Sequence, residues 1–412
     1  MELRAALRGG ATALPQRLGL RRRLQLETAE EVAEADLDEL ESLVEKSLVR
    51  RWSSGRLGLL ETIREFAVER LDESGEGDEL RRRHAAWYAG LAEDLRPRLW
   101  DAQHPATIAR FDADHANLLA ALDWSDRNDD ELLLRLAAGV SEYWLIRGFF
   151  REGRRWLERA LAATELKTPA RAVALIGVSA LAHLQGDDED ARRAAEQALA
   201  LTRELGDTTG TVYALNRLAN ALSAAGALED ALTLYNEAVE LARPAGPSRP
   251  LAVSLINVGD ARSKQGARQL AKAALNEALT VFDAIGNRPG RAAALLDLGR
   301  LAIDEGALGQ AVVTLAESLR ISRDLGRGAR IALCLEAFAA VAERQGEPAR
   351  VVRMLAAATR LRQETGAGRS DRDPALAAAR AVLGERAFEE AWASGFAMTL
   401  DEAVEDALAT VD

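Results

Sequence analysis

The acidic and histidine residues are the first place to look for chemistry in this chain. Asp112, Asp114 and His115 stand close together in the sequence and could suggest metal ligands. Residues two apart diverge by roughly 200° around a helix, so Asp112 and Asp114 would not share a face. No other histidine stands at a His-x3-His spacing. We therefore predict a helix N-cap at 112–115 and a second acidic helix start at 187–190, where carboxylates meet the positive end of the dipole, and no metal site.

Candidate nucleophiles are equally sparse. The single cysteine, Cys334, stands among apolar residues of the segment 331–335, which is typical of a small core side chain and not of a reactive thiol. The sequence contains neither a Gly-x-Ser-x-Gly nucleophile elbow nor a His-Glu-x-x-His zinc motif. We therefore predict no catalytic residue, no cofactor and no metal, and a protein that is not an enzyme.

Aromatic residues concentrate in the segment 87–156, which contains Trp87, Trp100, Trp124, Trp144 and Trp156. Large aromatic side chains bury extensive area, so this concentration predicts a core. A ligand-binding aromatic cage is the alternative.

Glycines punctuate the second half of the chain at a constant interval. One series recurs every 40 residues from Gly186 to Gly346, and a second series, offset by 20, runs from Gly206 to Gly366. Glycine adopts at little cost the positive φ that ends a helix, so each of these positions should end one. A fixed period in this range predicts an all-α solenoid of stacked helical pairs. The predicted pairs are 170–206, 210–246, 250–286, 290–326 and 330–366, after a divergent pair at 132–165.

Small residues recur within these pairs at fixed positions. Ala191 follows Gly186 by five residues, Ala198-Leu199 follows seven later, and the first helices carry small residues such as Gly259 and Gly299. The spacing Gly-x4-Ala-x6-Ala-Leu resembles the tetratricopeptide repeat, which usually spans about 34 residues. The six extra residues would extend the second helix by roughly 1.7 turns. The resemblance implies a right-handed superhelix of helical pairs.

The tetratricopeptide resemblance also implies where a partner would bind. In that family the first helix of each pair lines the concave groove. Asn220, Asn257 and Lys264 resemble part of the family's carboxylate-binding clamp, but nearby aspartates would repel a carboxylate. The mixed charges favour a mixed-charge protein or peptide partner in the groove, and an ordinary solvated face is the alternative. The groove positions map onto Tyr213, Asn216, Arg217, Asn220, Asn257, Asp260, Lys264, Asp297, Arg300, Asp304 and Glu336.

Residues 36–73 follow a different pattern, which predicts helix, hairpin and helix. A helix ending at Lys46, two short strands around a turn at 53–55 and an amphipathic helix at 61–72 outline a winged-helix remnant. Basic residues cluster at the hairpin, where a wing could contact phosphate. Glutamates crowd the same unit, so we interpret the cluster as a solvated face and predict no direct contact with nucleic acid. The basic residues are Lys46, Arg50, Arg51 and Arg56.

Several stretches of the chain carry a second resemblance. They are LVEKSLV (43–49), LLETIREFA (59–67), RRRHAAWY (81–88), FDADHANLLAAL (111–122), 144–161 and 388–403. Together they resemble the region after the nucleotide-binding module in bacterial NB-ARC-type (STAND) regulators, many of which carry LuxR-like or SARP-like DNA-binding domains. The resemblance covers residues 36–412 and implies the sensor region of a bacterial transcriptional regulator.

The same resemblance shows what this chain lacks. The family's ATPase holds its nucleotide with a G-x4-G-K-[ST] loop, and the chain contains no Gly-Lys pair. The residues before 36 are too few for a nucleotide-binding domain of roughly 150 residues. No DNA-binding helix-turn-helix is expected after the repeats. We therefore expect the sensor part alone. The alternative is a fragment of an ATP-dependent regulator whose nucleotide-binding domain is encoded separately and acts as its partner.

Composition limits the remaining possibilities. The net charge of −12 argues against broad electrostatic capture of nucleic acid, and no apolar run approaches the roughly 18 residues of a membrane span. The absence of a secretory signal and the single cysteine predict a cytoplasmic location without membrane contact. The predicted organisation is a mobile segment at 1–35, the winged-helix-like remnant at 36–73, a helical junction with the divergent pair at 76–165, five repeats at 170–366 and capping helices at 372–412.

Overall fold

The chain divides into two compact units. The computed structural model describes residues 26–34, 37–52, 55–101, 104–365 and 373–409. One unit comprises Met1–Arg96 and Ala106–Gly139, and the other comprises Pro97–Pro105 and Val140–Asp412. The predicted junction at 76–165 is therefore shared between the two units, and the predicted domain boundaries remain a proposal.

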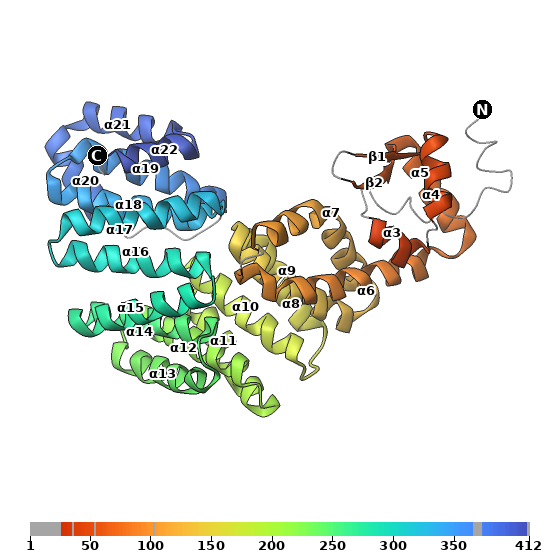
Figure 1. The fold of residues 1–412 in the computed structure, drawn as a ribbon, viewed down its shortest axis with the longest axis horizontal. Coiled ribbons are helices and arrows are strands. Elements are labelled where there is room, and N and C mark those ends of the chain that lie inside the picture. The colour runs from red at the N-terminus through yellow and green to blue at the C-terminus, as the bar shows by residue number, and fades with distance from the viewer. Residues whose placement is uncertain (1–25, 35–36, 53–54, 102–103, 366–372, 410–412) are drawn as a thin grey trace. The chain divides into compact units, whose positions relative to one another are not determined.

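The first unit contains the predicted helix, hairpin and helix (Figure 1). Strands β1 and β2 pair antiparallel, with Val49 opposite Leu59. Leu40, Leu43, Leu57 and Ile63 are buried together beneath the hairpin, so the apolar pattern of this segment is explained by one small core. The elements are α3 (Leu26–Ala33), α4 (Leu37–Glu45), β1 (Val49–Arg51), β2 (Leu57–Leu59), α5 (Glu61–Ser74), α6 (Gly77–Leu95), most of α7 (His104–Asn128) and the start of α8 (Asp130–Arg147).

The expected mobile segment at 1–35 lies mostly outside the described residues. The expectation is wrong for residues 26–34, because α3 is a helix whose Val32 is buried with Leu71 and Leu80. Arg83 also donates a hydrogen bond of 2.8 Å from Nη2 to the backbone oxygen of Val32. Apolar packing and this hydrogen bond hold α3 against α6.

The acidic stretch at 112–115 lies in the middle of α7, so the predicted N-cap there is wrong. Asp114 is buried and accepts hydrogen bonds from Arg56, from Arg110 Nε at 2.6 Å, from Tyr88 Oη at 3.1 Å and from Asn117 Nδ2 at 3.2 Å. This network satisfies a carboxylate that would otherwise be costly to bury. Arg56 is buried with it, so the interpretation of the hairpin cations as a solvated face is wrong for that residue.

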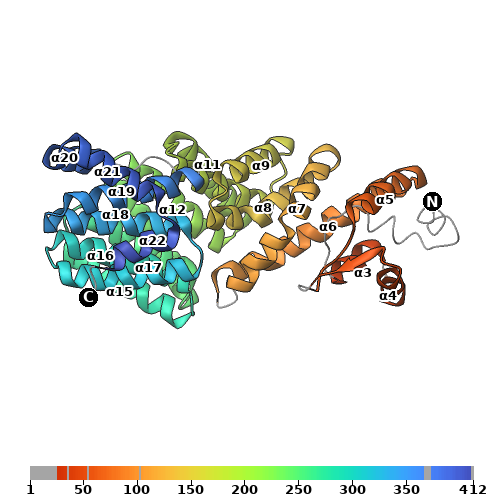
Figure 2. The same cartoon turned by 90° about the horizontal axis from the view of Figure 1, so that it is seen from above.

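The second unit is an all-α solenoid of consecutive helical pairs, as the glycine period predicts (Figures 1 and 2). The described glycines of both series, Gly186 to Gly346 and Gly206 to Gly326, have positive φ and follow helix ends. At α11, Asp187 is the N-cap residue and accepts from the backbone of Asp190, which confirms the predicted acidic helix start. The pairs are α10 (Pro169–Gln185) with α11 (Asp188–Leu205), α12 (Thr208–Ala224) with α13 (Leu228–Ala242), α14 (Arg249–Lys264) with α15 (Arg268–Ala284), α16 (Arg288–Asp304) with α17 (Leu308–Asp324), and α18 (Gly328–Gln345) with α19 (Pro348–Thr365).

Close packing within each pair explains the small residues of the repeat. A Cβ atom at Gly259 would lie 2.6 Å from Leu275 Cγ, and one at Gly299 would lie 2.6 Å from Leu315 Cγ. Both distances are too short for a larger residue unless the leucine side chain or its helix shifts. The extra length of the repeat is not confined to the second helix, since α16 and α17 both have 17 residues and α18 and α19 both have 18. That part of the prediction is wrong.

Most of the described aromatic residues of the second unit belong to its core. Tyr143, Trp144, Phe150 and Trp156, on α8 and α9 (Phe150–Ala163), are buried, which confirms the core interpretation for them. Trp144 packs against Gly153 and donates from Nε1 to Glu152 at 3.1 Å. Trp100 has a different environment, described below.

The last repeat is covered by three short helices, α20 (Asp373–Leu383), α21 (Glu385–Ala397) and α22 (Leu400–Leu408). Phe388 is buried in the core that includes α18 and α19, and it stacks on Trp392 with ring centroids 6.3 Å apart. The exposed apolar face that a terminal repeat would leave is thereby closed. Cys334 is fully buried in the same core, and burial raises the pKa of its thiol, which confirms its interpretation as a core side chain.

Candidate functional site

A pocket of about 560 Å³ lies on the side of the solenoid formed by the first helices of successive pairs. Its volume is in the range of about 300–1,000 Å³ that is usual for ligand sites. We call it the inner pocket. Most of its lining comes from α8, α10, α12, α14, α16 and α18, with one residue each from α9, α13 and α15 and Trp100 from the 3-10 helix η1 (Pro97–Trp100).

The repeat period explains why these side chains converge. Residues spaced by 3 and 4 on one helix share a face, and the 40-residue period places equivalent faces of successive first helices side by side. The pocket therefore receives the same two repeat positions from three helices. These are Arg217, Asn257 and Asp297 at one position, and Asn220, Asp260 and Arg300 at the other.

Seven of the eleven predicted groove residues line the inner pocket. Asp304 lies instead in a neighbouring hollow of about 290 Å³, which shares Asp260, Lys264 and Arg300 with the pocket. Tyr213 lies beside the pocket, where its Oη accepts a hydrogen bond of 2.9 Å from Arg249 Nη1. The seven are Arg217, Asn220, Asn257, Asp260, Lys264, Asp297 and Arg300.

Two predicted groove residues are not accessible to a partner. Asn216 is fully buried, donates from Nδ2 to Ser254 Oγ at 2.8 Å and accepts from Asn257 Nδ2 at 2.8 Å. Glu336 is buried against Arg362, whose Nε lies 2.6 Å and whose Nη2 lies 3.1 Å from its carboxylate. Each is one residue before a groove position of the repeat, and one residue turns a helix by about 100°, enough to point the side chain into the packing between helices.

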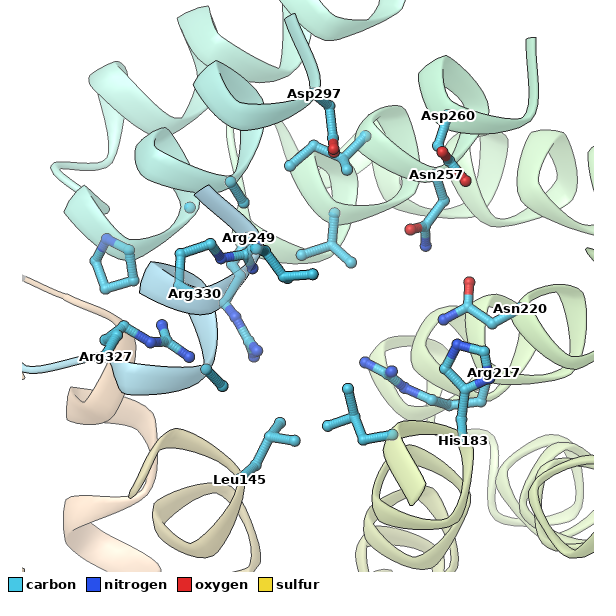
Figure 3. A pocket seen from close by; sticks show the side chains of 18 of the residues that line it. Leu145, His183, Arg217, Asn220, Arg249, Asn257, Asp260, Asp297, Arg327 and Arg330 are labelled. Atoms are coloured by element: carbon cyan, nitrogen blue, oxygen red, sulfur yellow. The ribbon is translucent and has the colours of Figure 1, made fainter. Parts of the chain in front are cut away.

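The sequence prediction missed four features of the pocket that carry its charge and shape. Arg249 lies at the start of α14, while Arg327 and Arg330 lie at the start of α18. Figure 3 shows Arg217 on one side of the pocket and Arg327 and Arg330 across from it. The fourth feature is Trp100, whose ring lies between two guanidinium groups. The Cζ atoms of Arg249 and Arg327 are 3.8 Å and 5.0 Å from its centroid. We call Arg217, Arg249, Arg327 and Arg330 the pocket arginines.

The pocket arginines have few anionic partners. Arg249 lies 3.5 Å from a carboxylate oxygen of Glu142. Arg217, Arg327 and Arg330 form no ion pair within the described parts of the chain, and the Nε of Arg217 is buried without a hydrogen bond. Burial and, after it, the charge of Arg249 lower the pKa of Arg217. Burial followed by the charges of Arg330 and Arg249 lowers the pKa of Arg327, and burial also lowers that of Arg330. The four arginines are half-buried and line one pocket.

Acidic and amide side chains also line the pocket. Burial raises the pKa of Asp297 to about 6, although Arg300 lies 3.6 Å away. Asp260 forms an ion pair of 2.7 Å with Lys264, and Asn220 accepts from Tyr235 Oη at 2.6 Å. The pocket thus has a strongly cationic end, beside Leu145 and Val253, and a mixed-charge end that continues toward Asp304.

The described residues contain no group of three or more His, Cys, Asp or Glu side chains placed to hold a metal ion. None of their helices combines the length and hydropathy needed to cross a bilayer.

Comparison with known families identifies the repeats. Residues 210–284, which span α12 to α15, match the family model of the tetratricopeptide repeat. The match is to these two helical pairs, and the other pairs of the solenoid share their fold. The first helices of the pairs contribute most of the side chains of the inner pocket, and their role as a partner-binding groove stays a prediction.

The curated relatives are named as transcriptional regulators. Proteins named as HTH-type transcriptional regulators in Mycobacterium tuberculosis and Mycobacterium bovis are 35% identical to this chain over 192 residues. The match covers 43% of this chain and 22% of each relative, so the chain spans under a quarter of the length of these proteins.

Solved structures show the same fold. A STAND protein with a tetratricopeptide repeat sensor from Pyrococcus horikoshii matches with a TM-score of 0.50 and 14% identity, over 97% of this chain and 65% of that protein. A Rap protein, solved in complex with the Competence and Sporulation Factor, matches with a TM-score of 0.52 and 16% identity, over 81% of this chain and all of that protein. At this identity the likeness concerns the fold alone.

Proposed function

We propose that this chain is a non-enzymatic interaction module whose inner pocket and adjoining hollow bind a protein or peptide partner. The observation that carries the proposal is the convergence of polar and charged side chains from successive first helices onto one pocket. A surface with cationic, acidic and apolar parts suits an extended peptide that carries both charged and apolar side chains. Tetratricopeptide folds generally serve as scaffolds, and this module acts by binding.

We further propose that the module is the sensor part of a bacterial transcriptional regulator. Support comes from the 35% identity to proteins named as HTH-type transcriptional regulators. The structural likeness to a STAND protein with a tetratricopeptide repeat sensor agrees in fold. In this proposal the partner's occupancy of the pocket is the signal, and residues 36–73 are a winged-helix-like unit that does not contact DNA.

Site-specific crosslinking in the source cell tests the binding role. A photo-crosslinking amino acid replaces Ser223, which lines the pocket on α12. A matched control replaces Asn236, which is exposed on α13 and outside the pocket. We expect a discrete adduct at position 223 and none at 236. Equal adducts at both positions, or none at 223, would contradict the proposal.

A charge-reversal variant then tests whether the same partner depends on the groove. Lys264→Glu with Arg300→Glu changes two residues shared by the pocket and the hollow, and neither contributes to the buried Asn216–Asn257 hydrogen bond. The control reverses Arg203 and Arg243, which are exposed on α11 and at the end of α13. We expect the crosslinked partner to bind at least about tenfold more weakly to the groove variant and unchanged to the control.

A second candidate function is a fragment of an ATP-dependent STAND-type regulator. It is favoured by the length of the relatives, of which this chain covers 22%. A reading frame for a nucleotide-binding domain directly before this gene, whose product copurifies with the chain, would support this candidate. Its absence would favour the module acting with an unrelated partner.

A further inference from the structure

We infer that the ligand of the inner pocket is an acidic peptide segment, whose carboxylates bind the pocket arginines. This inference rests on the proposed function and specifies the partner. The chain as a whole carries a net charge of −12, so a concentration of arginines in one pocket runs against its overall charge. Four guanidinium groups from α12, α14 and α18 face the same space.

The cationic end lacks the carboxylates that would satisfy it. Within the described residues, Glu142 is the only carboxylate within 4 Å of a pocket arginine, and it lies 3.5 Å from Arg249. Like charges held together in a poorly solvated space destabilise one another unless an anion neutralises them. Arginine guanidinium groups bind carboxylates in bidentate geometry, which makes a bound oxyanion the natural complement of this arrangement.

Helix termini add to the positive potential at this end. The first residues of α14, α16 and α18 line the pocket, among them Arg249, Gly290 and Arg330. The N-terminus of a helix carries a partial positive charge. Cationic side chains at this end of a helix oppose the dipole. Arg249 is already paired with Glu142, but Arg327 and Arg330 form no ion pair within the described residues, so a bound anion would stabilise them.

The remaining walls favour a peptide over a small inorganic anion. Leu145, Ile146, Val253 and Leu333 form apolar surface beside the arginines, and a phosphate ion would leave that surface in water. The pocket also continues through Asp260, Lys264 and Arg300 into the second hollow. An extended segment with acidic side chains at one end and apolar side chains between them would cover both parts.

The test uses the full chain and two arrays of heptapeptides with blocked ends. Each peptide of the first array carries three aspartates or glutamates among leucine, isoleucine and alanine, and the second array replaces them with asparagine or glutamine. Blocked ends ensure that no terminal carboxylate is measured. We expect binding to members of the acidic array only, with affinity that falls as salt is raised. Equal binding to both arrays, or no binding to either, would overturn the inference.

The matched variants assign the binding to the pocket arginines. The pocket variant carries Arg217→Gln, Arg327→Gln and Arg330→Gln. The control carries Arg203→Gln, Arg243→Gln and Arg288→Gln, which removes the same charge from exposed positions outside the pocket. We expect the pocket variant to bind acidic peptides about a hundredfold more weakly while its melting temperature stays at or above that of the unchanged chain. Similar losses in both variants would overturn the assignment.

A competition experiment with pyrophosphate distinguishes an acidic peptide from a small phosphorylated ligand, and the crosslinked partner tests the proposed function separately. Inorganic pyrophosphate should displace the peptide only at far higher concentration than a second acidic peptide does. If pyrophosphate binds tightly and no acidic peptide binds, the pocket belongs to a small phosphorylated molecule and the inference is overturned. If a partner crosslinks at position 223 but binds the pocket variant unchanged, the proposed function stands and the acidic ligand does not.

Discussion

Arginines on the exposed side of the repeats form ion pairs, whereas most of those in the inner pocket form none with the described residues. On the exposed side, Arg203 pairs with Glu237 at 2.6 Å and Arg243 pairs with Glu277 at 2.8 Å, each linking one repeat to the next. Arg203 and Arg243 are 40 residues apart, and so are Glu237 and Glu277, so the same ion pair recurs with the period of the repeats. In the inner pocket, Arg217, Arg327 and Arg330 have no such partner in the described ranges.

This comparison suggests two roles for arginine: the paired, exposed arginines link successive repeats, and the pocket arginines that form no ion pair with the described residues are open to a ligand. An exposed ion pair contributes at most about 1 kcal/mol and is screened by salt. A desolvated cation without a counter-ion lowers stability until something binds it. We therefore expect an arginine that faces a carboxylate to stabilise the solenoid and an arginine without one to be open to a ligand. The predictions below test this distinction by comparing matched changes on the two sides.

The largest effect is expected where an ion pair is buried. Glu336→Ala removes the carboxylate that holds Arg362 of α19 at 2.6 Å, and we expect it to lower the free energy of unfolding by about 3–5 kcal/mol. Glu237→Ala removes the exposed partner of Arg203 and should cost less than about 1 kcal/mol. Amide hydrogen exchange is the suitable measurement, because a repeat array can open locally. Equal protection of α18 and α19 in both variants would show that burial does not determine the value of the pair.

The acidic side of the pocket should make stability depend on pH. Burial raises the pKa of Asp297 to about 6, above its value of about 4 in an unfolded chain, despite the attraction of Arg300, Arg330 and Lys264. The folded state then binds more protons than the unfolded state between pH 4 and pH 6, so the free energy of unfolding falls as the pH rises through this window. Asp297→Asn should remove this decline and raise stability at pH 7 by about 1–3 kcal/mol.

Urea denaturation at pH 4.5 and pH 7, with and without Asp297→Asn, measures this contribution. Asp283→Asn is a suitable control, since Asp283 is exposed and paired with Arg291. The control should keep the decline between the two pH values. If the decline persists in Asp297→Asn as well, another group is responsible for it.

The glycine period was sufficient to predict the helical pairs, and the tetratricopeptide resemblance supplied the expectation that the first helix of each pair lines the groove. The regular period fixes helix ends, and the spacing of polar residues within each first helix then defines a face. It could not distinguish Asn216 from Arg217 or Glu336 from Ala337. Adjacent residues differ by about 100° around the helix, and the rotation of each helix is set by packing against its partner. The N-cap predicted at 112–115 was also wrong. A cluster of acidic residues in the sequence can mark the start of a helix or a carboxylate buried within one, and the sequence alone does not distinguish the two.

The cationic end of the pocket was missed because its residues lie outside the faces that the period defines. Arg249 and Arg330 stand in the first turns of α14 and α18, Arg327 is the N-cap residue of α18, and Trp100 comes from a segment far away in the sequence. Position in the first turn would not have singled out the arginines, because Arg268 and Arg288 begin α15 and α16 and lie outside the pocket.

The smallest expected change in the free energy of unfolding has opposite signs for a pocket arginine and an exposed arginine. Arg217 on α12 and Arg203 on α11 belong to adjacent helices, and each can be replaced by glutamine. Burial lowers the pKa of Arg217, so its charged form is disfavoured in the folded state at every pH below that lowered value. Arg217→Gln should therefore raise the free energy of unfolding at pH 7 by about 1 kcal/mol, whereas Arg203→Gln should lower it by a few tenths. Thermal unfolding at low and high salt would measure both. A loss of stability in Arg217→Gln would mean that the packing of its aliphatic stem outweighs the charge, and the distinction between structural and available arginines would then fail at this position.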